Sequence, residues 1–338
     1  MNEEKYPLKE DYKSSLTIYE DELAIVEIKM FFQKALSNVL NLKRATAPLF
    51  LDADTGLNDN LSGKERPVGF SIKEHPESHL EVVQSLAKWK RYALGQYSFH
   101  MHEGLYCDMN AIRRDEELDN LHSIYVDQWD WEKIISKNDR NTNYLEKCVR
   151  QIYSSIRACE EHVYGLYPYI GKILPKEITF IDSEKLLSLY PDKEPKERER
   201  LFAKEHGAIF IERIGGCLSN GKKHDERAPD YDDWSLNGDI LVYYPLLDVA
   251  LELSSMGIRV DSESLKRQLD ESHTSERAEL PFQKAIIENK LPLTIGGGIG
   301  QSRLCMFMLR KAHIGEVQSS YWDEENIEYA KMHNITLL

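Results

Sequence analysis

Four glycines, one arginine and an apolar run mark the stretch Leu293-Thr-Ile-Gly-Gly-Gly-Ile-Gly-Gln-Ser-Arg303-Leu-Cys-Met-Phe-Met-Leu309. Because glycine has no Cβ, the backbone of residues 296–300 can turn sharply and approach a ligand closely. Residues 304–309 are almost wholly apolar, which predicts a buried helix rather than an amphipathic one. The sequence therefore predicts a glycine-rich turn followed by a core helix, with Arg303 in the first turn of that helix.

Arg303 is the informative residue of this stretch. A buried guanidinium is costly unless an anion meets it, and a helix N-terminus itself favours an anion. Two interpretations fit: Arg303 pairs with a structural carboxylate, or it binds an anionic ligand. The stretch alone leaves both open.

The composition narrows the class of protein. The chain has 338 residues, of which 41% are apolar and 30% charged. These values predict a soluble protein with a sizeable core, and no apolar run is long enough to span a membrane. The acidic, polar start lacks the apolar segment of a secretion signal, so a cytoplasmic location and no membrane partner are expected.

Charge and cysteine usage exclude further classes. The formal net charge is -14, which leaves no surplus of basic residues for phosphate contacts, so no nucleic-acid partner is expected. Carboxylates are, however, compatible with sites that hold Mg²⁺. The five cysteines are scattered without a CxxC spacing, which indicates reduced thiols rather than a disulfide framework or a zinc site.

The order of the expected elements indicates the fold class. Apolar residues recur at helical spacing in two long segments, and expected strands come in adjacent pairs rather than alternating regularly with helices. That order favours an α+β fold, a mainly antiparallel β-sheet flanked by helices. No linker interrupts the chain, so we expect a single catalytic domain over residues 1–338 with a peripheral N-terminal arm at 1–20. The principal expected helices are 22–40, 143–163 and 195–206, and the principal strands are 104–113, 121–132, 208–214, 238–245 and 249–258.

The segment 121–132 differs from an ordinary core strand. Period-two alternation places polar groups and large rings on both of its faces. An edge strand with a solvated side would explain this pattern, and so would a strand that lines a pocket. One face carries His122, Ile124, Val126, Gln128 and Asp130, and the other carries Ser123, Tyr125, Asp127, Trp129 and Trp131.

Carboxylates and cations recur at expected strand ends and loops. Such a mixture suits a phosphorylated ligand with Mg²⁺, because the metal bridges phosphate oxygens and arginine neutralises charge during an in-line displacement. The P-loop and Rossmann fingerprints are absent from the sequence. The acidic residues are Asp59, Asp130, Asp232, Asp239 and Glu252, and the cations are Lys90, Arg113, Arg259 and Arg303.

Several long motifs in order resemble one family. From about Leu23 to the C-terminus, the chain is similar to the ammonia-dependent asparagine synthetases, or aspartate–ammonia ligases. That family resembles a class II aminoacyl-tRNA synthetase catalytic core without its tRNA-binding module. The motifs are residues 59–63 (DNLSG), 84–91 (QSLAKWKR), 121–132, 227–234 (RAPDYDDW), 238–242, 252–259 (ELSSMGIR) and 296–303.

The resemblance implies a two-step reaction. The β-carboxylate of aspartate would attack the α-phosphorus of Mg-ATP, giving β-aspartyl-AMP and pyrophosphate. Ammonia would then displace AMP to give asparagine. The family resemblance also implies a homodimer. Glutamine is not expected as the nitrogen donor, because Asn2 follows Met1 and no N-terminal cysteine nucleophile can form.

The same resemblance implies roles for individual residues. Arg113 would hold the α-phosphate and the attacking carboxylate, and Arg303 would bind the ATP phosphates. The residues expected to bind or orient aspartate and ammonia are Lys90, Ser85, Gln128, Asp130, Arg259, Asp59 and Asp232. Those expected around the nucleotide are Ser123, Val126, Ser254, Ser255 and Gly298, with Asp239 and Glu252 as carboxylates of the Mg²⁺ or phosphate shell.

The chain departs from the family pattern at one loop, and two other functions remain as alternatives. The family usually has a longer loop after Trp234, here reduced to Ser235, which places solvent exclusion from the site in question. A stand-alone synthetase-like protein could instead adenylate an amino acid and pass it to a tRNA or a protein. A regulatory amino-acid binder on the same fold is the non-enzymatic alternative.

Overall fold

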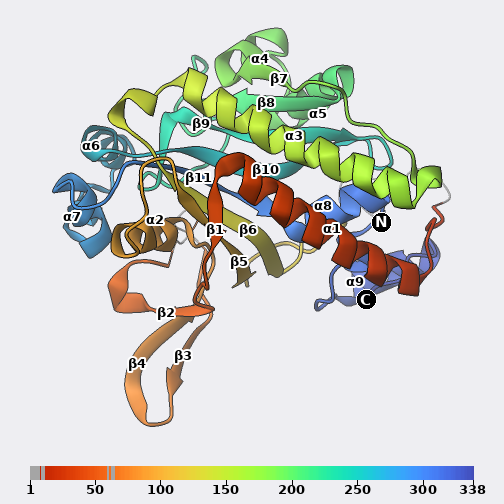
Figure 1. Ribbon diagram of the computed structural model, residues 1–338, viewed down its shortest axis with the longest axis horizontal. Helices are drawn as coiled ribbons and strands as arrows, with labels where there is room; N and C mark the ends of the chain where they lie inside the picture. Colours follow the sequence, from red (N-terminus) through yellow and green to blue (C-terminus); the bar gives the residue numbers. More distant parts are fainter. Residues whose placement is uncertain (1–7, 9–11, 59–60, 62–64) are drawn as a thin grey trace.

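A mixed sheet of eight strands forms the centre of the computed structural model, which describes residues 8, 12–58, 61 and 65–338 (Figure 1). Its strands, from edge to edge, are β1 (Leu42–Arg44), β5 (Gly104–Ile112), β6 (Tyr125–Ile134), β11 (Thr294–Gly300), β10 (Val249–Arg259), β9 (Asp232–Tyr244), β8 (Ala208–Glu212) and β7 (Thr179–Asp182). Neighbouring strands are antiparallel except for the pair at each edge. The mainly antiparallel α+β prediction is confirmed.

Three short strands make a second sheet that projects from the body (Figure 1). They are β2 (Phe50–Asp52), β4 (His75–Val82) and β3 (Gly69–Ile72). The helices are α1 (Ile18–Leu40), α2 (Ala87–Gln96), α3 (Thr142–Leu166), α4 (Ser183–Leu189), α5 (Pro195–His206), α6 (Ser262–Glu271), α7 (Pro281–Ile287), α8 (Gln301–Leu309) and α9 (Glu324–Met332). No helix among the described residues is long and apolar enough to cross a membrane.

Helices α1 and α3 lie side by side across one face of the large sheet (Figure 1). α1 begins at Ile18, earlier than expected, because Thr17 and Glu20 form a capping box that satisfies free N–H groups of the first turn. Beneath them α8 packs against α1, α3 and β6. Phe32 of α1 contacts Trp129 of β6, with ring centroids 4.7 Å apart. This layer is the main hydrophobic core.

The N-terminal arm also contributes to that core. Of its described residues, Leu8, Tyr12 and Leu16 are buried and belong to the same apolar cluster as α1 and α8. The Tyr12 hydroxyl donates a hydrogen bond of 2.9 Å to Glu316. The arm therefore packs onto the segment that follows α8.

Strand β6 separates the apolar core from a polar face. Trp129 and Trp131 are fully buried in the core, while Gln128 and Asp130 line a cavity on the opposite face. The alternation was predicted correctly, although β6 begins at Tyr125. Because β6 is paired on both sides, with β5 and β11, the edge-strand interpretation is wrong.

The glycines of the 293–309 stretch lie in strand β11, so the predicted turn is wrong. Gly296 pairs with Glu132 on one side and with Gly257 on the other. A Cβ at Gly296 would overlap the Glu132 carboxylate, and one at Gly298 would overlap the Gln128 amide. Glycine is needed here because side chains of the neighbouring strands fill the space above β11. The helix prediction for residues 304–309 is confirmed within α8.

Candidate active site

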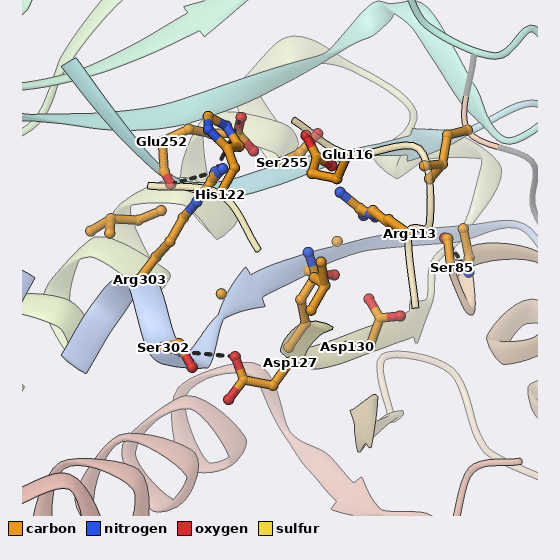
Figure 2. A pocket seen from close by; sticks show the side chains of 18 of the residues that line it. Ser85, Arg113, Glu116, His122, Asp127, Asp130, Glu252, Ser255, Ser302 and Arg303 are labelled. Carbon is orange, nitrogen blue, oxygen red and sulfur yellow. Dashed lines mark hydrogen bonds and ion pairs between the residues drawn. The ribbon is translucent and has the colours of Figure 1, made fainter. Parts of the chain in front are cut away.

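A cavity of about 520 Å³ lies on the polar face of the sheet (Figure 2). Strands β6, β10 and β11 supply part of its wall, and helices α2, α5 and α8 supply side chains. The loops around residues 113–123 and 225–232 contribute further lining residues. The predicted residues that line it are Ser85, Lys90, Arg113, Ser123, Val126, Gln128, Asp130, Asp232, Glu252, Ser255, Arg259, Gly298 and Arg303. The resemblance therefore selected residues that the fold brings together.

At one end, Lys90 of α2 extends to β6 and β11. Its Nζ donates hydrogen bonds of 2.6 Å to Asp130 Oδ1 and 3.1 Å to the Gly297 carbonyl. Both side chains are almost fully buried. The second oxygen of Asp130, Oδ2, has no hydrogen-bond partner among the described residues. A buried carboxylate oxygen without a donor is costly, so this oxygen is available to a ligand's ammonium group.

Ser85 lies just before α2 and influences how this helix begins. The residue at the N-cap position is Leu86, without a side-chain capping bond. The Ser85 hydroxyl instead accepts a hydrogen bond of 3.2 Å from the backbone N–H of Ala87. The serine thus orders the start of the helix that carries Lys90.

A buried ion-pair network underlies this end of the cavity. Arg259 donates from Nε and Nη2 to Glu132 at 2.8–3.1 Å and from Nη1 to Asp232 at 2.5 Å. Burial raises the pKa of Asp232 despite its pairing with Arg259. Burial likewise opposes the charge on Glu132, but Arg259 outweighs it and lowers the Glu132 pKa. Arg259 thereby fixes Asp232 at the cavity wall.

Arg303 enters the cavity from the first turn of α8. The N-terminus of α8 is already satisfied by a protein carboxylate, because Asp127 Oδ1 accepts a hydrogen bond of 3.0 Å from the Ser302 N–H. Arg303 extends toward Glu252 (Figure 2), with Nη1 3.2 Å from the Glu252 carbonyl and 3.7 Å from its Oε2. A carboxylate at that distance leaves most guanidinium donors available, which favours the ligand-binding interpretation of Arg303.

Arg113 follows β5 and points into the cavity (Figure 2). Its backbone N–H is bonded to the Ile124 carbonyl at 2.8 Å, while its buried Nε has no hydrogen-bond partner among the described residues. Burial works against ionisation of Glu252, yet surrounding cations lower its pKa, namely Arg303, Arg227, Lys196 and Arg113 in decreasing order of effect. So many cations around one carboxylate suit a polyanionic ligand.

Asp239 of β9 lies beside Glu252 and is bound by Arg227. Arg227 Nη2 donates to Asp239 Oδ2 at 2.5 Å, and Arg227 Nη1 donates to Ser255 Oγ at 2.8 Å. Burial raises the pKa of Asp239 to about 8, with Arg227 opposing the rise and Glu252 adding to it. Asp239 is therefore not itself part of the cavity wall, but it is bonded to Arg227, which is.

The remaining predicted residues differ in placement. Ser123 and Val126 line the cavity, and the Ser123 hydroxyl lies 2.7 Å from that of Ser320. Ser254 is buried and is not part of the described cavity wall. Asp59 lies outside the described residues.

No long loop follows Trp234, in agreement with its reduction to Ser235 in the sequence. Residues 234–236 belong to β9, which runs from Asp232 to Tyr244. The register between β9 and β10 shifts between the pair Gly257–Asn237 and the pair Arg259–Asp232, so this part of β9 contains a strand irregularity. Residues 225–227 and 231, which precede this strand, line part of the cavity.

Three functional candidates were missed from the sequence. Arg227 begins the 227–234 motif, whose charge density was the available signal. Glu132 ends the 121–132 strand, but its partner Arg259 is distant in sequence. Lys196 lies in the first turn of the charged helix α5 and lines the cavity. Apart from the charge of that helix, nothing in the sequence indicated a role for it in the site.

Solved structures define the class to which this fold belongs. An asparaginyl-tRNA synthetase from Entamoeba histolytica, in complex with asparaginyl-adenylate, matches with a TM-score of 0.64 at 13% identity, covering 90% of this chain and 68% of that one. The enzyme from Pyrococcus horikoshii, complexed with asparaginyl-adenylate, matches with a TM-score of 0.57 at 13% identity, covering 88% and 68%. The fold is that of the class II aminoacyl-tRNA synthetase catalytic core.

Sequence comparisons identify the family. The profile of the aspartate-ammonia ligases matches residues 19–334. Aspartate–ammonia ligase from Clostridium perfringens (strain SM101 / Type A) is 59% identical over 99% of this chain and 100% of the relative. The enzyme from Lactobacillus johnsonii is 57% identical, over 98% and 99% of the two chains. This chain therefore belongs to the aspartate–ammonia ligase family and is an enzyme of the ligase class.

Proposed function

We propose that the enzyme makes L-asparagine from L-aspartate and ammonia through β-aspartyl-AMP, releasing AMP and pyrophosphate. The observation that carries the proposal is one cavity with Lys90 and Asp130 at one end and Arg113 and Arg303 toward the other. The first pair suits an amino acid with two carboxylates and an ammonium group. The arginines suit a nucleotide phosphate chain beside it.

The first step joins aspartate to the nucleotide. An oxygen of the β-carboxylate forms a bond to the α-phosphorus, the bond from that phosphorus to the bridging oxygen breaks, and pyrophosphate leaves. Arg113 would hold both reacting groups, because it lines the cavity that also contains Lys90 and Asp130, and its Nε is unpartnered among the described residues. A positioned guanidinium stabilises the charge that develops on the phosphoryl oxygens.

The second step consumes the mixed anhydride. The ammonia nitrogen attacks the acyl carbon, and AMP leaves with the oxygen that came from the carboxylate. Asp232 would orient ammonia, since Arg259 fixes this carboxylate at the cavity wall with a hydrogen bond of 2.5 Å. Burial raises its pKa, which helps it accept a proton from the attacking nitrogen. Asp59 shares this proposed role on the strength of the family motif.

Mg²⁺ fits the carboxylates at the phosphate end. Mg²⁺ is usually held by one or two carboxylates together with substrate phosphates. Asp239 Oδ1 is buried without a hydrogen-bond partner in the described part of the chain, and Glu252 lies close enough to raise the Asp239 pKa. Asp239 and Glu252 would hold the ion, which supplies positive charge for the phosphates.

Product analysis tests the proposal. Aspartate, ATP, Mg²⁺ and ammonium should give AMP and asparagine in equal amounts, and glutamine as the only nitrogen source should give none. ADP as the nucleotide product would contradict the proposal. AMP formation that needs tRNA and ignores ammonium would favour an adenylating protein with a different acceptor. Aspartate-dependent exchange between pyrophosphate and ATP would exclude a regulatory binder.

We also propose that the enzyme works as a homodimer. Helix α1 exposes five apolar side chains, with exposed fractions between 48% and 74%, namely Ile18, Tyr19, Leu23, Val26 and Met30. An exposed apolar stripe of this kind is typical of a protein–protein interface. Light scattering during gel filtration should give twice the chain mass, and Val26→Asp should shift it to the monomer mass.

A further inference from the structure

Arg227 makes a set of contacts that the proposed reaction does not explain. It lies in the loop between β8 and β9 and reaches into the cavity wall. Its Nη2 bonds Asp239 Oδ2 at 2.5 Å and Asp225 Oδ2 at 2.9 Å. Its Nη1 bonds Ser255 Oγ at 2.8 Å. The Arg227 guanidinium therefore forms an ion pair with Asp239, the carboxylate that we propose as a Mg²⁺ ligand.

One carboxylate oxygen cannot serve both cations at once. A Mg²⁺ ligand lies about 2.0–2.1 Å from the ion, whereas Asp239 Oδ2 is already in contact with Arg227 Nη2. The other oxygen, Oδ1, has no hydrogen-bond partner among the described residues. A metal ion that binds Asp239 would therefore meet one free oxygen and one blocked by a guanidinium.

The local charge explains why a cation is needed there. Three carboxylates, Asp225, Asp239 and Glu252, meet around Arg227. A buried carboxylate without a counter-ion is costly. Both side chains of the Arg227–Asp239 pair are 12% exposed, so water compensates them little. Arg227 supplies the positive charge in the unliganded site.

We propose that Arg227 is a positioning residue that occupies the metal side of Asp239 until Mg-ATP enters, and then turns to a phosphate oxygen. The inference rests on the proposed function, which assigns Asp239 to the metal and the neighbouring cations to the phosphates. Phosphate is a suitable second partner for arginine, because guanidinium N–H groups match phosphate oxygens in pairs. The Arg227 Nε, buried and unpartnered within the described chain, remains available for such a bond.

Because of this exchange, the affinity for the metal ion depends on whether the nucleotide is bound. A free metal ion that binds Asp239 Oδ1 meets the positive charge of Arg227 on the neighbouring oxygen and offers the guanidinium no other anion, so binding of the metal alone is weak. Metal that arrives with the nucleotide provides the phosphate that Arg227 then binds. The structure thus favours joint entry of metal and nucleotide, a coupling that acts equally on both ligands.

Mn²⁺ binding tests the proposal without any turnover. Mn²⁺ alone is titrated into the full-length protein, and free Mn²⁺ is measured by electron paramagnetic resonance. Arg227→Met should bind Mn²⁺ at least about tenfold more tightly than the unchanged enzyme, within the usual range of coupling between sites. Arg227→Lys keeps the cation and should resemble the unchanged enzyme. Arg213→Met, in the same loop but paired with Asp182 at the surface, should have no effect.

The double variant Arg227→Met, Asp239→Asn locates the site, because it should lose the tight Mn²⁺ binding again. Equal Mn²⁺ affinity in Arg227→Met and the unchanged enzyme would overturn the proposal. Tight binding that survives in the double variant would also overturn it, since the metal would then lie elsewhere. Circular dichroism confirms that each variant is folded. The titration is independent of the nucleotide product, so an ADP product would reject the reaction while leaving this result interpretable.

Discussion

A single methyl group at Gly298 should lower the catalytic efficiency of the enzyme far more than its stability. Gly298 lies in β11 and lines the cavity, where it pairs with Asp130 of β6 and Ser255 of β10. A Cβ at this position would overlap the Gln128 side-chain oxygen and come within 3.0 Å of Asp130 Oδ1. Its φ is not in the left-handed region, so alanine fits the backbone and only the side chains must move.

The size of the effect follows from which atoms move. Gln128 presents the flexible end of its side chain, so it can shift at little cost. Replacing glycine also restricts the unfolded chain, which stabilises the fold by about 0.4–1 kcal/mol. An added group in a packed region costs about 1–3 kcal/mol, and the gain from the unfolded chain offsets part of that cost, so we expect the unfolding free energy of Gly298→Ala to fall by less than about 2 kcal/mol. A displacement near 1 Å in an active site costs on the order of 100-fold in rate, so kcat/KM for aspartate should fall by about that factor.

The assay follows pyrophosphate release at varied aspartate concentration, beside guanidinium unfolding of the same samples. Gly216→Ala is the matched control, since a Cβ there would meet nothing within 4 Å, and it should leave kcat/KM unchanged. If Gly298→Ala kept the kcat/KM of the unchanged enzyme, Gln128 and Asp130 would not contact aspartate. If it unfolded the protein, the methyl group would be displacing the sheet rather than the Gln128 side chain.

Three further predictions concern stability, nucleotide binding and pH. In Gly296→Ala the methyl group would overlap the Glu132 carboxylate and lie 2.7 Å from Arg259 Nη2. Because that buried pair cannot move cheaply, the unfolding free energy measured in guanidinium should fall by about 3–5 kcal/mol, and a loss below that of Gly298→Ala would refute this. Arg303→Ala should raise KM for ATP roughly 10- to 100-fold, because charged hydrogen bonds to the phosphates are lost. The temperature of thermal unfolding should stay unchanged. An unchanged KM would show that Arg303 has only a structural role. Burial raises the pKa of Glu316 from 4.5 to about 7, so the folded state favours the protonated carboxyl. Its contribution to the free energy of unfolding is fully present below about pH 4.5 and is lost as the pH rises through 7. Relative to Glu316→Gln, the unchanged enzyme should therefore lose up to about 3 kcal/mol between these pH values, and a constant difference in urea midpoints would argue against that pKa.

Elements with a clear period were predictable from the sequence. The alternation along residues 125–131 correctly assigned Trp129 and Trp131 to one face and Gln128 and Asp130 to the other. The apolar run 304–309 correctly indicated a buried helix. In both cases the pattern reflects which side of the element meets the core, and this information is local to the segment.

The glycine strand could not be predicted, because its cause is not local. Gly296 and Gly298 are needed because Glu132 and Gln128 of a neighbouring strand fill the space above them. A turn signal and a crowded strand look the same in the sequence. For the same reason the network of Glu132 with Arg259 was missed, since its members are distant in the chain and only the sheet brings them together.

The candidate site was predictable mainly through the family motifs. Lys90, Arg113 and Arg303 line one cavity as the resemblance implied. The contact between Arg227 and Asp239 was not predictable, because it depends on a loop conformation that charge density alone does not specify. Pairing among charged side chains is set by tertiary packing, so residue type indicates that a cation is present but not which anion it binds.

The path of one oxygen atom tests the central claim most directly. Aspartate labelled with ¹⁸O in its β-carboxylate is converted with ATP and ammonium, and the products are weighed by mass spectrometry. Attack on the α-phosphorus predicts one ¹⁸O atom in each AMP formed, because AMP leaves with the carboxylate oxygen. Label that appears in inorganic phosphate with ADP as the nucleotide, or AMP without label, would contradict a β-aspartyl-AMP intermediate.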